Sequence, residues 1–135
     1  MQLNGFVQAG VGNAAYWLEK NADAYCLWTG MKLVPGSLNV QLPSKFDLSS
    51  PDIAPFKRVH SLVPFGGNRD ICLVPCEIFA DESNRIYAFA WATTFAANEA
   101  DYHVLEIVSD IHLRTALGLQ DGMKVSIEIP LPWKV

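Results

Sequence analysis

The sequence predicts a mainly β fold, a closed or nearly closed β-barrel with two short helices in a single domain. Short apolar runs of strand length recur along the chain, turn residues separate them, and only two segments have helical character. Two short helices cannot cover both faces of a parallel sheet, so a doubly wound fold is disfavoured. A barrel needs no such cover, because it closes its own edges.

The first part of the chain predicts a strand, a helix and a second strand. The first strand is expected over Leu3–Gln8, where a glycine-containing stretch then ends it. Residues 14–28 carry aromatic and apolar side chains among helix-compatible residues, which predicts a helix ending before Gly30. Leu38–Leu42 alternates apolar and polar residues, as a half-buried strand does.

The rest of the chain predicts five further strands and one short helix. The strands are expected over Arg58–Pro64, Ile71–Phe79, Arg85–Trp91, Val104–Val108 and Met123–Ile129. The polar run at residues 81–84 joins the second and third of these as a hairpin. The helix is expected over residues 111–117, with Asp110 as its N-cap and Gly118 as its end.

Composition limits the classes of function. The 135 residues are 50% hydrophobic and 18% charged, which indicates one folded domain over residues 1–135 rather than a disordered chain. The net charge of -4 argues against broad attraction to nucleic acid. The chain shows no signal peptide and no run of the ~18–20 apolar residues that cross a membrane. We therefore expect a cytoplasmic monomer without a membrane or nucleic-acid partner.

Cysteine and histidine do not suggest a structural metal or a disulfide framework. The three cysteines cannot all pair within the chain, and Cys72 and Cys76 would lie ~13 Å apart on an extended strand. The three histidines lie in separate predicted elements, without the spacing of zinc ligands. These residues therefore predict neither a zinc site nor a cross-linked scaffold.

The segment Leu33–Val40 is the most informative part of the sequence. Pro35 and Gly36 predict a sharp turn immediately before a strand. Ser37 and Asn39 are two residues apart, so on a strand they face the same side. A hydroxyl oxygen and an amide carbonyl oxygen can together ligate a hard cation such as Mg²⁺. The alternative is that both residues form the solvent face of an ordinary strand.

Two other segments could take part in the same chemistry. Backbone amides in a glycine-containing strand-to-helix connection can hold phosphate, although such a stretch can also be only a tight turn. Here that connection comprises Gly10, Val11, Gly12, Asn13 and Ala14. Glu106 lies in an otherwise apolar run, where a carboxylate is expected to be paired or poised for proton transfer, unless it simply faces solvent.

Together these segments resemble the archaeal-type CTP-dependent riboflavin kinases, over nearly the whole chain and in the same order. The family's G-x-G-E-G stretch and the aromatic pair after it correspond to residues 10–14 and 16–17, with Asn13 and Ala14 replacing the acid and the last glycine. Its P-G-T-L-N-V/L-x-L strand corresponds to residues 35–42, with Ser37 in place of Thr. Its C-terminal motif, L/I-E-I-I/V-A-P-x-x-L-R and a later D-G-D-x-V, is followed from residue 105 to residue 125.

The resemblance implies a cradle-loop-type barrel that transfers the γ-phosphate of CTP to riboflavin, yielding FMN and CDP. It implies that Ser37 and Asn39 hold Mg²⁺ and that residues 10–14 bind the nucleotide. We hypothesise that Glu106 is the catalytic residue, which binds the ribityl hydroxyl and takes its proton. Thr93 or Thr94 would contact the substrate from the segment before the Glu106 strand.

Several alternatives remain open at the level of sequence. The flavin ring could stack on Tyr16, Trp17, Trp91 or Phe95. The changes at residues 13 and 14 leave room for a non-catalytic barrel that binds flavin or nucleotide, and for ATP instead of CTP as the donor. A third class is a protein- or DNA-interaction module, for which the acidic balance disfavours DNA.

Overall fold

The computed structural model describes residues 1–10, 14–46, 51–93 and 103–129, with the side chain of Thr93 left aside. This part holds the strands β1 (Gln2–Gln8), β2 (Leu38–Gln41), β3 (Arg58–Ser61), β4 (Asp70–Phe79), β5 (Ile86–Thr93), β6 (Val104–Val108) and β7 (Lys124–Glu128). It also holds the α-helices α1 (Ala14–Lys20), α2 (Ala22–Thr29) and α3 (Leu113–Leu117), and the 3₁₀ helices η1 (Ala54–Phe56) and η2 (Val63–Phe65). None of the helices in these ranges is long and apolar enough to cross a membrane.

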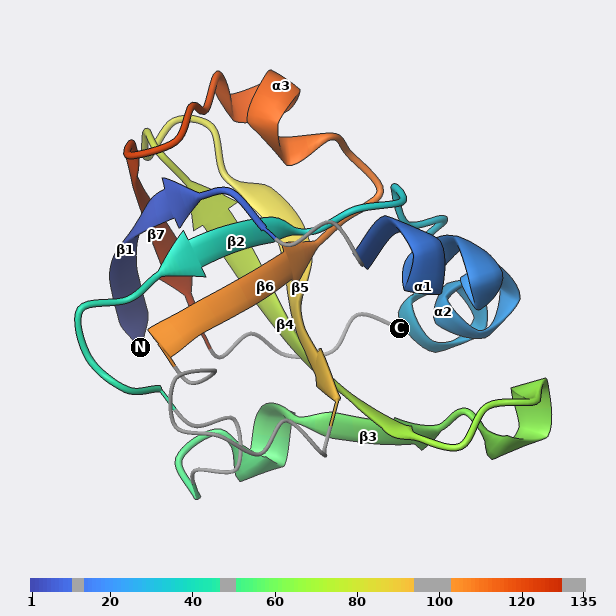
Figure 1. Cartoon of the computed structure of the whole chain (residues 1–135). Coiled ribbons are helices and arrows are strands. Elements are labelled where there is room, and N and C mark those ends of the chain that lie inside the picture. Colours follow the sequence, from blue (N-terminus) through green and yellow to red (C-terminus); the bar gives the residue numbers. More distant parts are fainter. Residues whose placement is uncertain (11–13, 47–50, 94–102, 130–135) are drawn as a thin grey trace.

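Six of the strands close an antiparallel barrel in the order β4-β5-β6-β2-β1-β7, and β7 pairs back with β4 (Figure 1). The closing register sets Ile78 opposite Ile127. β3 pairs with β4 and lies outside the ring. The mainly β barrel expected from the sequence is therefore confirmed, together with the hairpin between β4 and β5.

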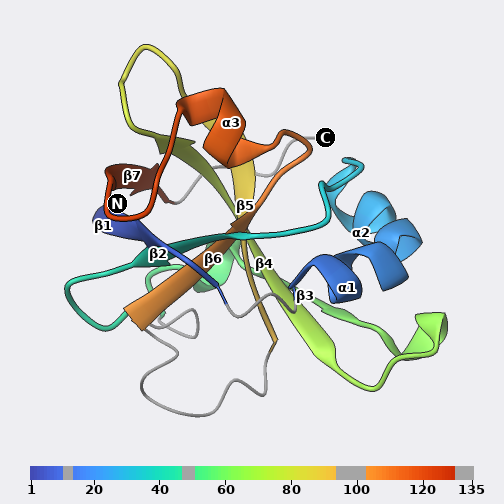
Figure 2. The ribbon, with the colours of Figure 1, turned by 45° about the horizontal axis from the view of Figure 1, so that its top comes forward.

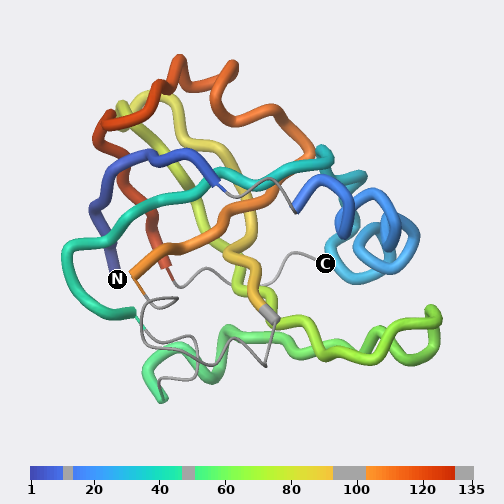
Figure 3. The backbone as a smooth tube through the Cα atoms, viewed as in Figure 1, coloured from blue at the N-terminus to red at the C-terminus, as the bar shows by residue number. Residues whose placement is uncertain are grey.

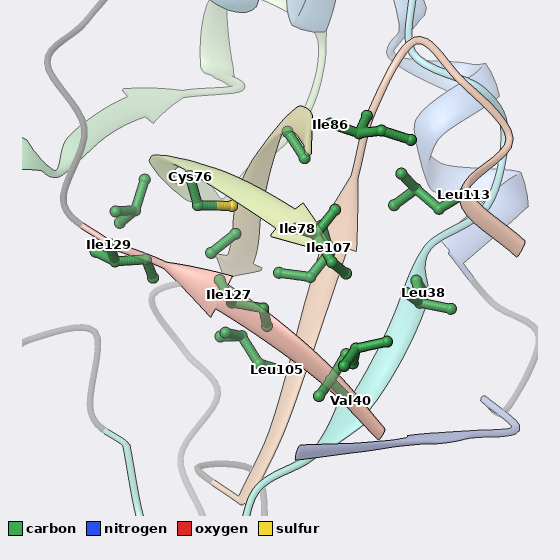
Figure 4. Close-up of a cluster of buried hydrophobic side chains, with 14 of the residues drawn as sticks. Leu38, Val40, Cys76, Ile78, Ile86, Leu105, Ile107, Leu113, Ile127 and Ile129 are labelled. Carbon is green, nitrogen blue, oxygen red and sulfur yellow. The ribbon is translucent and has the colours of Figure 1, made fainter. Parts of the chain in front are cut away.

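Alternate residues of the strands fill the barrel with branched aliphatic side chains. On β2 the inward residues are Leu38 and Val40, and on β6 they are Leu105 and Ile107, all buried in one cluster (Figure 4). Because the side-chain period of a strand is two residues, the residues between them face the outside of the barrel. Asn39 and Glu106 are two of those outward residues, and both are partly buried.

A second apolar cluster lies outside the barrel, between the helix pair and the outer face of β4 and β5. Figures 1 and 2 show α1 and α2 together at one side of the barrel. Leu18 of α1 and Tyr25 of α2 pack there with Leu73, Phe89 and Trp91. The indole Nε1 of Trp91 donates a hydrogen bond of 2.9 Å to the hydroxyl of Tyr25. Burial, partly offset by this hydrogen bond, raises the pKa of Tyr25 to about 12.

The path of the chain brings β1 and β2 together, although the helix pair separates them in sequence. Figure 3 shows the chain leaving β1, passing through α1 and α2, and returning as β2 beside β1. The antiparallel register sets Val7 opposite Val40. Residues at the end of β1 are therefore neighbours of the beginning of β2.

The helix expected over residues 14–28 is interrupted at Asn21, so this part of the prediction is wrong. α1 ends at Lys20 and α2 begins at Ala22. The Asn21 side chain donates a hydrogen bond of 3.1 Å to the carbonyl oxygen of Trp17. Asparagine disfavours helix interiors because its amide competes for such backbone groups. Gly30 ends α2 with a φ of 73°, as expected from the sequence.

The start of the last helix and the end of β3 also differ from the expected boundaries. The last helix begins at Leu113 with His112 as its N-cap, so Asp110 is not the cap, while Gly118 ends the helix as expected. β3 ends at Ser61, three residues before the expected end at Pro64. The Ser61 hydroxyl there accepts a hydrogen bond of 3.1 Å from the amide of Val63, which turns the chain into η2.

The buried hydrogen bond between Trp91 and Tyr25 gives a test of the packing of α2 on the barrel. Tyr25→Phe removes the acceptor and leaves a buried indole N–H without its partner. We expect the free energy of unfolding in urea to fall by about 1–3 kcal/mol. Tyr16→Phe is the matched control, because Tyr16 is 59% exposed, and should change it by less than about 0.5 kcal/mol. Equal effects of the two substitutions would contradict this account.

Candidate functional site

A row of polar residues crosses the outer surface where β1, β2 and β6 lie side by side. The register sets Gln8 opposite Asn39 and Asn39 opposite Glu106. The next strand, β5, sets Trp91 opposite Glu106. Gln8, Asn39 and Glu106 are all partly buried. The row therefore lies at the border between the surface and the apolar cluster under the helices.

Ser37 and Glu106 are joined by a hydrogen bond across β2 and β6. Ser37 precedes β2, and its hydroxyl donates to a carboxylate oxygen of Glu106 over 3.0 Å. The preceding turn contains Gly36 at a φ of 138°, in the region that glycine alone adopts readily. The carboxylate on the apolar strand is thus paired, as its surroundings require.

Gly10 lies two residues after the end of β1 and borders the site on that side. A Cβ atom placed on Gly10 would overlap Nδ2 of Asn39 and would lie 3.2 Å from its Cγ. The main chain of Gly10 therefore lies directly against the Asn39 carboxamide. Gly10, Ser37, Asn39 and Glu106, which are far apart in sequence, meet at one place on the barrel.

The structure describes only some of the other candidate residues. Ala14 is the first residue of α1, while Val11, Gly12 and Asn13 lie outside the described residues. Thr93 is the last residue of β5, two positions after Trp91, which pairs with Glu106. Thr94 and Phe95 lie outside the described residues.

A small pocket adjoins Ser37, between the start of β2, the end of β6 and α3. Its volume is about 130 Å³, below the roughly 300–1,000 Å³ of pockets that enclose a small molecule, so it can hold only part of a nucleotide. The polar residues among those that line it are Ser37, Ser109, His112 and Arg114. The Nη2 atom of Arg114 donates 2.7 Å to Asp121 and 3.3 Å to the carbonyl oxygen of Gln8.

The donor atoms at the site fit a hard cation. Oxygen donors are available from the Ser37 hydroxyl, the side-chain carbonyl of Asn39 and the Glu106 carboxylate. Mg²⁺ prefers oxygen to nitrogen or sulfur. Among the described residues, no group of three or more His, Cys, Asp or Glu side chains could hold a metal ion. A cation here would thus draw on the neutral side-chain oxygens of Ser37 and Asn39 and complete its coordination with water or with oxygens of a substrate.

The sequence analysis assigned no role to three contributors to this region, although Arg114 belongs to the C-terminal motif. Gln8 pairs with Asn39, Ser109 lines the pocket, and Arg114 ties the end of β1 to α3. Ser109 is 2% exposed and donates a hydrogen bond of 3.0 Å to the carbonyl oxygen of Tyr87. Their neighbours come from other strands, and a single sequence carries no signal for pairing between distant strands.

The fold and the site define a small closed antiparallel barrel with a cluster of oxygen donors on its outer surface. A family model of the CTP-dependent riboflavin kinase domain, described as a domain of unknown function (DUF120), matches residues 7–129. The match covers most of the barrel and all of the site. The chain belongs to this family.

Three proteins named riboflavin kinase are similar to the chain. The proteins of Methanococcoides burtonii and Methanospirillum hungatei are 29% and 31% identical over 96% and 97% of this chain. The chain spans only 57% and 58% of their lengths. The Methanobrevibacter smithii protein is 30% identical over 95% of this chain and 99% of its own length. One relative therefore consists almost entirely of the matching domain.

The two hydrogen bonds of Arg114 predict a measurable contribution to stability. Arg114→Ala removes its bonds to Gln8 and Asp121, and we expect the free energy of unfolding in urea to fall by about 1–2 kcal/mol. Asp121→Ala removes only the ion pair and keeps the bond to the backbone of β1, so its effect should be smaller. An unchanged stability of the Arg114 variant would show that this contact does not hold β1 to α3.

Proposed function

We propose that this domain is a CTP-dependent riboflavin kinase, which transfers the γ-phosphate of CTP to riboflavin and produces FMN. The observation that carries the proposal is the meeting of Ser37, Asn39 and Glu106 beside Gly10, which follows the end of β1. The family membership and the names of the three relatives support the same reaction. The Methanobrevibacter smithii protein, which consists almost entirely of the matching domain, supports an activity confined to this domain.

The reaction forms one bond to phosphorus and breaks another. The terminal ribityl hydroxyl oxygen attacks the γ-phosphorus, the bond to the oxygen bridging the β- and γ-phosphates breaks, and CDP leaves with that oxygen. The hydroxyl proton passes to the Glu106 carboxylate, which acts as general base. Such transfer depends mainly on positioning and charge neutralisation.

Glu106 is well placed to position a hydroxyl group. Its neighbours Leu105 and Ile107 are buried in the barrel, so the backbone beneath the carboxylate is rigid. One carboxylate oxygen accepts the Ser37 hydroxyl, which restricts how the carboxylate can turn. A fixed carboxylate can accept a hydrogen bond from substrate without losing much side-chain freedom on binding.

We propose that Ser37 and Asn39 hold Mg²⁺ through their side-chain oxygens. A bound Mg²⁺ would neutralise phosphate charge and leave most of its coordination to water and phosphate oxygens. Backbone amides of residues 10–14 would bind the phosphates, and the Arg114 side chain adds a cation at the neighbouring pocket.

Differences in exposure among the aromatic side chains support one proposal for flavin stacking. Trp91 is 7% exposed and bonded to Tyr25, so its ring faces the protein core. Tyr16 and Trp17 are 59% and 47% exposed and meet edge to face at 4.9 Å. We propose that the flavin ring contacts this exposed pair, and that Thr93 or Thr94 contacts the substrate.

The monomeric state, the cytoplasmic location, the single domain over residues 1–135 and the absence of a nucleic-acid partner stay predictions.

The first experiment measures FMN formation. The purified domain is incubated with riboflavin and Mg²⁺, and with CTP or ATP separately, and FMN is separated from riboflavin by chromatography. We expect FMN with CTP, little with ATP, and none when EDTA removes divalent cations. FMN with ATP alone would keep the kinase reaction but replace the donor. Riboflavin binding without any FMN would instead support a non-catalytic flavin-binding barrel.

The metal assignment is tested by Asn39→Ala. Loss of a cation ligand should lower kcat/KM for FMN formation on the order of 100-fold, with partial recovery at high Mg²⁺. Gln41→Ala is the matched control, because Gln41 lies two residues further along β2 and is exposed. It should leave kcat/KM close to that of the unmodified protein. Normal activity of the Asn39 variant, with an unchanged unfolding midpoint, would refute the assignment.

A further inference from the structure

The contact between Gly10 and Asn39 is tighter than any side chain at residue 10 would allow. A Cβ on Gly10 would overlap Nδ2 of Asn39 and would lie 3.2 Å from Cγ and 3.7 Å from Oδ1. By comparison, Cβ atoms placed on Gly30 or Gly66 would meet nothing within 4 Å. The absence of a side chain at residue 10 is therefore a steric requirement of the Asn39 carboxamide.

The barrel register explains why these two residues meet. β1 and β2 run antiparallel with Gln8 opposite Asn39, so the chain just beyond Gln8 passes the start of β2. Glu106 flanks Asn39 from the other side, on β6. The carboxamide therefore lies between the main chain of Gly10 and the Glu106 strand.

The orientation of the carboxamide decides whether Asn39 can bind a cation. The amide nitrogen is a hydrogen-bond donor without an available lone pair, and the carbonyl oxygen is the only ligand that the side chain offers. The nitrogen is the carboxamide atom nearest to the Gly10 side, and the oxygen is the farther one. The side of the carboxamide that faces away from β1 thus carries the oxygen.

We propose that Gly10 is a positioning residue for the Asn39 carboxamide. By lacking a Cβ, it leaves room for the Asn39 carboxamide in the orientation that sets the amide nitrogen beside β1 and Oδ1 on the far side, where the oxygen can bind a divalent cation. This role is separate from any contact between the Gly10 backbone and phosphate. The inference rests on the proposed function for the cation itself, whereas the steric contact is a property of the apoprotein.

The test replaces Gly10 by alanine and measures binding of Mn²⁺ alone, from the electron paramagnetic resonance signal of the free ion. We expect Gly10→Ala to weaken Mn²⁺ binding by about 10-fold or more, because the added methyl forces the carboxamide to turn. Gly66→Ala is the control, since Gly66 lies between β3 and β4 at a φ of 86° in open space. It should lower stability through backbone strain and leave Mn²⁺ binding unchanged.

A double-mutant cycle separates a direct effect through Asn39 from a general loss of structure. In the Asn39→Ala background the obstructed carboxamide is gone, so Gly10→Ala should weaken Mn²⁺ binding no further and should affect stability less. In the unmodified protein, nuclear Overhauser effects should connect the Asn39 side-chain amide protons with the Gly10 α-protons. Loss of these effects in Gly10→Ala, with other signals retained, would show that the carboxamide has turned.

The outcomes distinguish failure of the positioning role of Gly10 from failure of the assignment of Asn39 as a cation ligand. If Asn39→Ala weakens Mn²⁺ binding and Gly10→Ala does not, the positioning role is refuted while the cation assignment stands. If neither substitution alters Mn²⁺ binding, the assignment of Asn39 as a cation ligand fails and the role of Gly10 toward a cation fails with it. Equal effects of Gly10→Ala in both backgrounds would also refute a role exerted through Asn39.

Discussion

The pairing of β7 with β4 closes the barrel, and the core and the candidate site both follow from that closure. It turns an open antiparallel sheet into a ring, in which Ile78 and Ile127 face each other across the closing pair. Closure gives each of the six strands two neighbours within the ring, so the ring itself has no exposed backbone edge. It also separates inward from outward residues along every strand, and this separation assigns aliphatic side chains to the core and polar ones to the site.

The site is a consequence of neighbouring strands within that ring. β1, β2 and β6 each contribute one part of it, and the rigid backbone beneath them is held by the apolar interior on which they pack. The Ser37 to Glu106 hydrogen bond and the contact of Gly10 with Asn39 join the three strands at the surface. The proposed phosphate transfer is compatible with a net charge of -4, because local donors and a bound cation would act over a few ångströms, whatever the total charge.

The second apolar cluster, outside the barrel, holds the helix pair near the site. Tyr25 and Trp91 are bonded in this cluster, and Trp91 pairs with Glu106 on the next strand. The helices therefore pack on the same face of the sheet that carries the polar row. In this packing Trp91 is a buried core residue, whereas Tyr16 and Trp17 on α1 are exposed.

The positions of the strands, and the residues that share a face on each, were predictable from the amino-acid sequence, because both follow from alternation and turn residues over a few positions. β6 coincides with its expected range, and the turn at residues 35–36 precedes β2 as expected. The break at Asn21 and the late start of α3 were missed, since weak local preferences decide them. The contact of Ser37 with Glu106 across 69 residues, and the steric need for glycine at residue 10, could not be predicted in this way. Those contacts depend on strand order and register, which the closure of the whole barrel sets and no short segment encodes.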